Sequence, residues 1–162
     1  MSAAPAPRPG QPEYTVADLE AEPVFDVESF DNDDAVDLGL TAVEVIDERE
    51  FNLAVRIVLR GDVVFSAKLG ATGPQNDPWL IGKAAVAEHF GEPSMLVKLR
   101  HLEAGTPFDQ VEGLDHSVMR AAGGGIPLRV SGEVVGSITM SGEPDVIDHA
   151  TAAETLRRYL AR

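Results

Sequence analysis

The segment that decides the fold reads GGGIPLRVSGEVVGSITMSG from Gly123 to Gly142. It contains two apolar, β-branched runs, 126–130 and 134–141, joined by the short connection 131–133. Two runs of this kind around a glycine-containing connection are typical of a β-hairpin. The residues 143–145, Glu-Pro-Asp, then resemble the first turn of a helix. The segment therefore predicts a hairpin that leads directly into a C-terminal helix.

A second hairpin is predicted upstream, where the apolar runs 52–59 and 63–68 are separated by Gly61-Asp62. Apolar residues at helical spacing predict helices on both sides of the two hairpins. The first expected helix has its N-cap among residues 31–34 and ends near Glu48. Further helices are expected over residues 78–90, 94–103 and 114–122, and a C-terminal helix has Val146, Ala150, Ala153 and Leu160 on one face. Because tight turns join consecutive strands, the sheet should be mainly antiparallel. We predict an α+β fold, a mainly antiparallel sheet from two hairpins flanked by helices on both sides in a three-layer sandwich.

The chain of 162 residues suits one domain with a tail. Residues 1–23 carry five of the eleven prolines and few large apolar side chains. Such a composition does not offset the entropy of ordering the chain. We expect residues 1–23 to form a flexible, acidic, proline-rich leader and residues 24–162 to form a single α+β domain.

The composition excludes several classes of chemistry. The chain has no cysteine, which rules out disulfides, thiolate metal sites and cysteine nucleophiles. No apolar run approaches the ~18 residues of a membrane span, and the start lacks the pattern of a signal peptide. We expect a cytoplasmic protein that does not insert into membranes.

The net charge of −14 is concentrated at the front of the chain. Residues 1–50 hold 14 acidic and 2 basic side chains, whereas residues 51–162 hold 13 acidic and 11 basic ones. A field of this sign repels phosphates, so neither nucleic acid nor an anionic membrane is expected as a partner. The acidic front either keeps the protein in solution or attracts a cationic partner.

Lys83 is the first candidate for a ligand contact. It shares a helix face with Trp79, Val86 and Phe90, which places an ammonium beside an indole on an otherwise apolar stripe. There it could bind a carboxylate or phosphate of a ligand. The alternative is a lysine that lies along Trp79 with its ammonium in water.

His149 and Asp148 lie in the first turn of the C-terminal helix. A histidine there could ligate haem iron or move a proton, and the alternative is a neutral imidazole that bonds to the nearby backbone or the preceding strand. Asp148 could hold a proton or an ion, or simply complement the helix dipole. The other three histidines stand apart in sequence, so no dedicated metal site is expected.

Two glycine-containing turns are candidates for anion contacts. Gly124 and Gly125 could let backbone amides approach an anion, or they could form a tight turn that needs positive φ. They precede a strand, so they are no nucleotide fingerprint. Ser141 and Gly142 end a strand just before a helix, where unpaired N–H groups favour an anion.

Taken in order along the chain, four motifs resemble the haem-degrading-domain family of the GlcG and HbpS proteins, most closely its uncharacterised branch of short cytosolic proteins. They are Phe51-Asn52, 76–83 (NDPWLIGK), 123–127 (GGGIP), and 135–142 (VGSITMSG) with Asp148-His149. The likeness covers roughly residues 32–161. It implies a profilin-like sheet with helices on both sides, a homo-oligomer, and haem as a candidate cofactor, without establishing catalysis.

The leading hypothesis is an oligomeric domain that binds a small anionic ligand, haem among the candidates, between Lys83, the glycine turn and the segment 141–149. Its site residues are Trp79, Lys83, Gly124, Gly125, Ser141, Gly142, Asp148 and His149. One alternative is an interaction protein whose acidic N-terminal segment captures a cationic partner. Another is an oxidative enzyme that acts on haem or a small molecule and depends on His149 or Lys83.

Overall fold

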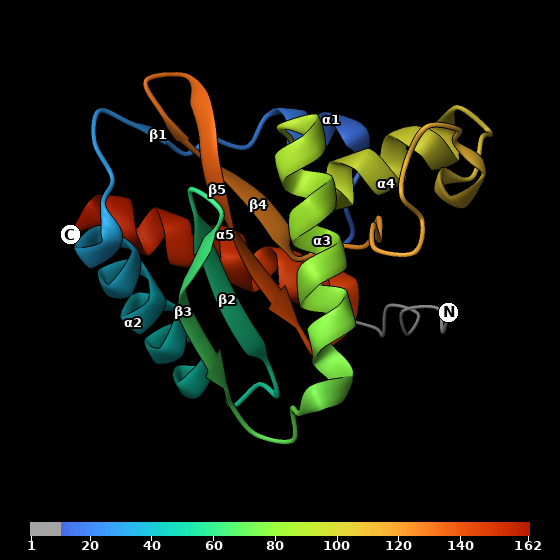
Figure 1. The fold of residues 1–162 in the computed structure, drawn as a ribbon. Coiled ribbons are helices and arrows are strands. Elements are labelled where there is room, and N and C mark those ends of the chain that lie inside the picture. Colours follow the sequence, from blue (N-terminus) through green and yellow to red (C-terminus); the bar gives the residue numbers. More distant parts are fainter. Residues whose placement is uncertain (1–10) are drawn as a thin grey trace.

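The computed structural model describes residues 11–162 as one sheet with helices around it (Figure 1). The strands are β1 (Asp26–Val27), β2 (Ala54–Leu59), β3 (Asp62–Lys68), β4 (Gly125–Val130) and β5 (Glu133–Ser141). The α-helices are α1 (Val16–Glu20), α2 (Asn32–Glu48), α3 (Asp77–Phe90), α4 (Ser94–Glu103) and α5 (Asp145–Ala161). Short 3₁₀ turns cover Pro74–Asn76 and Phe108–Gln110.

The sheet has the strand order β1-β4-β5-β2-β3. Both predicted hairpins are present, β2–β3 and β4–β5, and β5 pairs antiparallel with β2 at the centre of the sheet. Only the two-residue strand β1 pairs in parallel, with the end of β4. The prediction of a mainly antiparallel sheet built from two hairpins is confirmed.

Helices cover both faces of the sheet, as predicted. α2 and α5 lie behind the sheet in Figure 1, and α3 crosses its front. The main core lies between the sheet and the pair α2 and α5, because alternate residues of each strand, such as Val55, Ile57 and Ile138, point to that side. On the front, α3 packs mainly on β4 and β5, so the β2–β3 hairpin is left without a covering helix.

The close fit of α2 to the sheet depends on Gly39. A side chain at this helix position would place its Cβ 2.3 Å from the ring of Phe65 on β3. The missing side chain therefore provides the space that this ring fills. A glycine inside a helix lowers the stability of that helix relative to alanine.

The prediction of a flexible leader over residues 1–23 is wrong for residues 14–23, which pack on the domain. Residues 1–10 lie outside the described part of the chain. Thr15 caps α1 through a capping box with Asp18. Leu19 is buried and packs in a small cluster with Met95 and Leu96 of α4. Burying one large apolar side chain and satisfying the helix N-terminus holds this segment on the domain despite its acidic, proline-rich composition.

Residues 114–122 do not form the predicted helix but a series of turns. The carboxylate of Asp115 accepts a hydrogen bond from the backbone N–H of Ser117. A side chain that bonds its own neighbouring backbone in this way competes with helical hydrogen bonds. Among the residues from 11 to 162, no helix is both long and apolar enough to cross a lipid bilayer.

Candidate functional site

The Lys83 side chain extends from α3, past the end of β5, to α5. Its ammonium lies 2.9 Å from Oδ2 of Asp148 and donates to the carbonyl oxygen of Met140 at 3.0 Å. Only 2% of Lys83 and 1% of Asp148 is exposed. The lysine head is therefore neither in water nor open to a ligand, and it joins α3, β5 and α5 through one ion pair.

The Asp148 carboxylate is held on its other side by the backbone of the preceding loop. Its Oδ1 accepts a hydrogen bond from the Glu143 N–H at 3.0 Å. Burial raises the pKa of Asp148 to about 7, although the Lys83 ammonium acts in the opposite direction. The group is thus a buried acid whose pKa lies near neutrality.

The glycine turn fits closely around this ion pair. Gly124 has φ +134°, and a Cβ there would lie 2.3 Å from the Met140 oxygen and 3.1 Å from the Lys83 ammonium. A Cβ on Gly125 would meet the Lys83 backbone oxygen at 2.7 Å. The N–H of Gly125 is already bound by the Ser94 hydroxyl. These glycines allow close chain approach, and the Gly125 amide is not free for an anion.

Ser141 and Gly142 complete the same region. The buried Ser141 hydroxyl accepts a long hydrogen bond of 3.4 Å from the Asn76 side chain. Gly142 has φ +148°, and a Cβ there would lie 2.1 Å from the Asn52 backbone oxygen. The positive φ and the close backbone approach explain the glycine at the end of β5.

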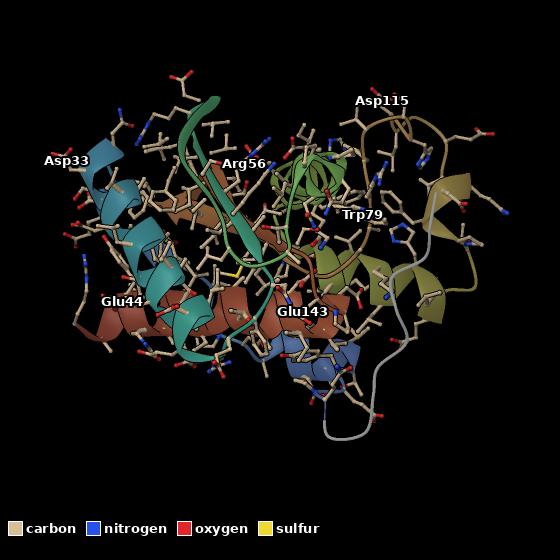
Figure 2. All side chains as sticks on the ribbon, turned by 90° about the horizontal axis from the view of Figure 1, so that it is seen from below. Asp33, Glu44, Arg56, Trp79, Asp115 and Glu143 are labelled. Atoms are coloured by element: carbon tan, nitrogen blue, oxygen red, sulfur yellow. The ribbon has the colours of Figure 1, made fainter. Side chains whose placement is uncertain are left out.

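Trp79 does not belong to this group. It lies on the side of α3 that faces the loop carrying Asp115 (Figure 2). The cation over its ring is Arg120, whose guanidinium carbon is 4.5 Å from the ring centroid. The expected pairing of Trp79 with Lys83 is wrong, because Lys83 turns inward to Asp148 instead.

His149 is fully buried and bonds to neither the backbone nor the preceding strand. Its Nε2 lies 2.8 Å from Oε1 of Glu22, in the segment after α1. Tyr14 packs edge-on against the imidazole, with ring centroids 5.0 Å apart. Nδ1 has no hydrogen-bond partner among the described residues. The N-terminal segment thus supplies both groups that enclose this histidine.

Three of the predicted segments do meet, since Lys83, Gly124, Ser141 and Asp148 lie around one junction of α3, β4, β5 and α5. The junction is packed and internally hydrogen-bonded. None of the eight predicted site residues lines the cavity at the edge of β4. A ligand-binding role for these residues stays a prediction, and their geometry suits fastening the elements together.

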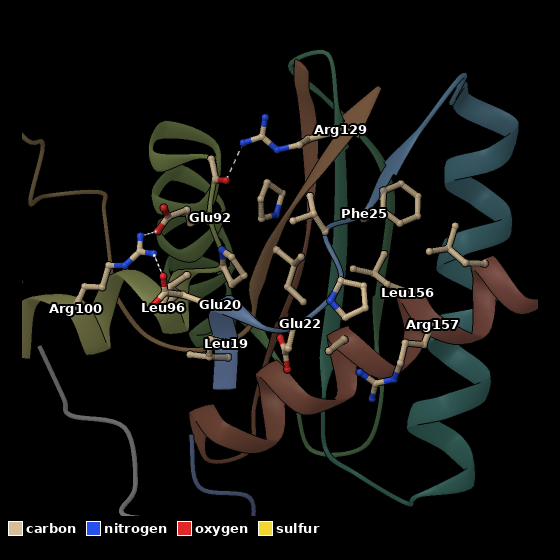
Figure 3. Close-up of a pocket in the computed structure, with 18 residues that line it drawn as sticks. Leu19, Glu20, Glu22, Phe25, Glu92, Leu96, Arg100, Arg129, Leu156 and Arg157 are labelled. Atoms are coloured by element: carbon tan, nitrogen blue, oxygen red, sulfur yellow. Dashed lines mark hydrogen bonds and ion pairs between the residues drawn. The ribbon is translucent and has the colours of Figure 1, made fainter. Parts of the chain in front are cut away.

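A cavity of about 410 Å³ opens at the free edge of β4, between α4, α5 and the segment 19–25 (Figure 3). Its wall is mostly apolar, with Leu19, Pro23, Val24, Phe25, Pro93, Leu96, Ile126, Pro127, Ala153, Leu156 and Leu160. β1 pairs with β4 only at Arg129 and Val130, which leaves the beginning of β4 unpaired on this side. Pro127 suits such an edge because it has no N–H to satisfy.

Three arginines and three glutamates add charge to the cavity wall. Arg100 is bound by Glu92 and Glu20, and Arg157 is bound by Glu154. Arg129 differs, because its guanidinium donates to the carbonyl oxygens of Gly91 and Gly132 at 2.9 and 2.7 Å.

No described carboxylate lies within ion-pair distance of Arg129, so its guanidinium at one end of the cavity is hydrogen-bonded only to backbone oxygens (Figure 3). The carboxylate of its strand neighbour Asp26 accepts from the Gly132 N–H instead. The volume and the mostly apolar wall with charged groups at its rim are compatible with a small-molecule site.

Sequence reasoning missed this cavity because its wall combines segments that are far apart in the chain. The signal for the segment 19–25 was present, as Thr15 and Asp18 have the spacing of a capping box just before Leu19. The proline-rich composition outweighed it. For Arg129, a charged residue at the end of an apolar strand run carries no distinctive pattern.

The fold and the cavity together define a small α+β domain with one sheet between two helical layers and a ligand-sized site at the sheet edge. The chain belongs to the family of the haem-degrading HbpS-like proteins, whose model matches residues 30–157. This confirms the family resemblance of the four sequence motifs.

A relative similar in sequence supports this assignment, and two solved structures share the fold. The UPF0303 protein SCO2848 of Streptomyces coelicolor is 41% identical over 150 residues, covering 90% of this chain and 94% of that protein. The crystal structure of the Ybr137w protein has a TM-score of 0.82 at 23% identity, with 92% of this chain and 90% of that chain covered. A structure described as a PduOC:Heme complex has a TM-score of 0.67 at 19% identity, with 81% and 94% covered. At these identities the two structures show the shared fold.

Proposed function

We propose that the chain is a small-ligand-binding domain whose ligand has an apolar body and one or more anionic groups. The observation that carries this proposal is the mostly apolar cavity at the edge of β4, with Arg129 at its end bound only to backbone oxygens. The apolar walls would bury the body of the ligand. Arg129 would release the carbonyl oxygens of Gly91 and Gly132 and donate to the anionic group instead. The proposal contains no catalytic step.

Haem is the ligand that the family description and the PduOC:Heme complex suggest. Its propionates suit Arg129, but the iron lacks a suitable partner in the cavity. The lining residues include no histidine, methionine, cysteine or tyrosine, which are the usual protein ligands of haem iron. His149 is enclosed behind Glu22. The residues therefore fit an amphipathic carboxylate and do not fit iron ligation.

Titration with 8-anilinonaphthalene-1-sulfonate tests the proposal, because this fluorescent probe joins an apolar ring system to one sulfonate. We expect saturable binding that weakens about tenfold to a hundredfold in Arg129→Gln, since one charge-assisted contact is worth about 1.5 to 3 kcal/mol. Leu160→Glu should weaken binding similarly, because Leu160 lines the cavity yet is half exposed and tolerates a polar side chain.

Matched controls lie outside the cavity. Arg49→Gln removes a surface arginine and Leu102→Glu changes an exposed leucine, and both should bind the probe like the unchanged chain. If Arg129→Gln and Leu160→Glu, folded by circular dichroism, bind the probe with unchanged affinity, the cavity is not the site.

A comparison of haemin with iron-free protoporphyrin IX tests whether haem binds through its carboxylates or through its iron. If the cavity recognises an amphipathic carboxylate, both should bind with similar affinity and both should depend on Arg129. Binding of haemin alone, abolished by His149→Ala, would show that the iron is ligated after rearrangement of Glu22.

We also propose that the chain forms a homo-oligomer, as the family resemblance implies. Light scattering after size-exclusion chromatography checks it, and a mass of 17.3 kDa would show a monomer instead.

A further inference from the structure

Arg56 lies on β2, on the front face of the sheet, where α3 covers β4 and β5 and only borders β2. It is opposite Thr139 on β5 and opposite Ser66 on β3 in the strand register. Its neighbours Val55 and Ile57 point into the core on the other face, so Arg56, Thr139 and Ser66 share the front face. Directly opposed residues on one face have Cβ atoms about 5 Å apart. Two hydroxyl-bearing residues thus lie on either side of Arg56.

The guanidinium of Arg56 lies between the β2–β3 hairpin and α3 (Figure 2). The residue is half-buried, and its Nε is fully buried without a hydrogen-bond partner among the described residues. No described residue forms an ion pair with it. The hydroxyl oxygen of Thr139, itself fully buried, also has no partner among these residues. Two adjacent buried polar groups without partners are unusual, because each carries a desolvation penalty.

The acidic groups on this face do not explain Arg56. Asp77 is bound by Lys68 at 2.9 Å. Glu88, on α3, accepts a hydrogen bond from Ser137 at 2.9 Å, and burial raises its pKa. The positive charge of Arg56 is therefore left without a carboxylate at hydrogen-bond distance.

We propose that Arg56, Thr139 and Ser66 form a binding site for a small oxyanion, a carboxylate or a phosphate. The terminal nitrogens of the arginine fork match two oxygens of such an anion, and the exposed Ser66 hydroxyl would donate to the same group. The Thr139 hydroxyl, which is fully buried, would reach the anion only after the surrounding side chains move aside. The site lies on the opposite side of the hairpin β4–β5 from the cavity edge of β4 and shares no residue with the cavity lining. It is thus a second site.

Nuclear magnetic resonance of the arginine Nε–H groups tests the site, with inorganic phosphate and acetate added at constant ionic strength. We expect a saturable shift of the Arg56 signal that Arg56→Gln removes. Thr139→Val, which keeps the shape and removes the hydroxyl, should weaken binding several-fold, and Arg56→Lys should weaken it about tenfold because the fork is lost. Arg49→Gln should leave the Arg56 signal unchanged.

Three results would overturn the proposal. One is a shift that does not saturate. Another is a large Arg56 shift caused by Glu88→Gln without added anion, which would mean that Arg56 pairs with Glu88 in solution. The third is a shift on dilution without anion, because a second copy of the chain would then be covering this face. Binding of the naphthalene sulfonate probe to Arg56→Gln should stay unchanged, so the two sites are tested independently.

Discussion

The ammonium of Lys83 and the carboxylate of Asp148 lie 2.9 Å apart with almost no exposure to water, and they join residues 65 positions apart. A buried pair of this kind contributes little net stability compared with an apolar pair, because both charges were taken out of water. Losing one partner is a different matter, because it leaves the other charge buried alone. The pair therefore makes the junction of α3, β5 and α5 intolerant of single changes.

Replacement of one partner should be far worse than replacement of both. At pH 8, Lys83→Met should lower the free energy of unfolding by about 3 to 5 kcal/mol, since Asp148 then lacks its cation. The double variant Lys83→Met/Asp148→Asn should recover most of this loss, because the amide oxygen can still accept from Glu143. Urea denaturation of the four proteins in the cycle measures the coupling. Simple additivity of the two single changes would contradict the ion pair.

Asp148 also predicts a pH dependence of stability. Its folded pKa of about 7 exceeds the ordinary value of 3.8, so between these values the folded chain binds more protons than the unfolded chain. The contribution of Asp148 to stability is therefore fully present below about pH 4 and is lost as the pH rises through 7. The loss is on the order of 1.4 kcal/mol for each unit of pKa difference.

Urea denaturation of the unchanged chain and of Lys83→Met/Asp148→Asn between pH 4 and 8 isolates this term, because the double variant leaves no buried charge behind. The free energy of unfolding of the unchanged chain, taken relative to the double variant, should fall with rising pH in this range and level off above it. A relative stability that rises over the same range would mean that the folded pKa is depressed instead.

Gly124 should be among the least replaceable glycines. Gly124→Ala places a Cβ 2.3 Å from the Met140 oxygen at a φ of +134°, so we expect a loss of about 3 kcal/mol or more. Gly132→Ala is the matched control, because Gly132 also has positive φ, +85°, but has open space around its missing Cβ. It should lose only about 1 to 2 kcal/mol from backbone strain. Equal losses would show that the contact with Met140 carries no weight.

The sequence predicted the two hairpins well because an alternating pattern such as 134–141 fixes which side chains face the core. A shift by one residue would turn the apolar side chains to the other face of the sheet. It suggested a ligand between Lys83, the glycine turn and the segment 141–149, but whether these segments converge depends on the placement of the hairpins in the sheet, which the sequence does not show. It could not predict that the three would satisfy one another, since burial depends on contacts between residues far apart in the chain. The N-terminal segment was misjudged because one buried residue, Leu19, outweighs the average composition around it.

Leu19 connects this packing to ligand binding, because the segment it anchors forms one side of the cavity. Leu19→Ala removes a buried leucine, which in general costs about 2 to 5 kcal/mol, although the loss cannot exceed the free energy of releasing the segment alone. Release would remove Glu22, Pro23 and Phe25 from the cavity wall. We therefore expect a modest fall in thermal stability with a large loss of affinity for the naphthalene sulfonate probe.

Leu102→Ala makes the same deletion at an exposed leucine and should change neither quantity. Hydrogen exchange of residues 14–25 reports the release directly, and it should be faster in Leu19→Ala while exchange in β4 and β5 stays slow. If exchange accelerates in the segment but probe affinity is retained, the segment does not close the cavity, and the ligand would be held by β4, α4 and α5 alone.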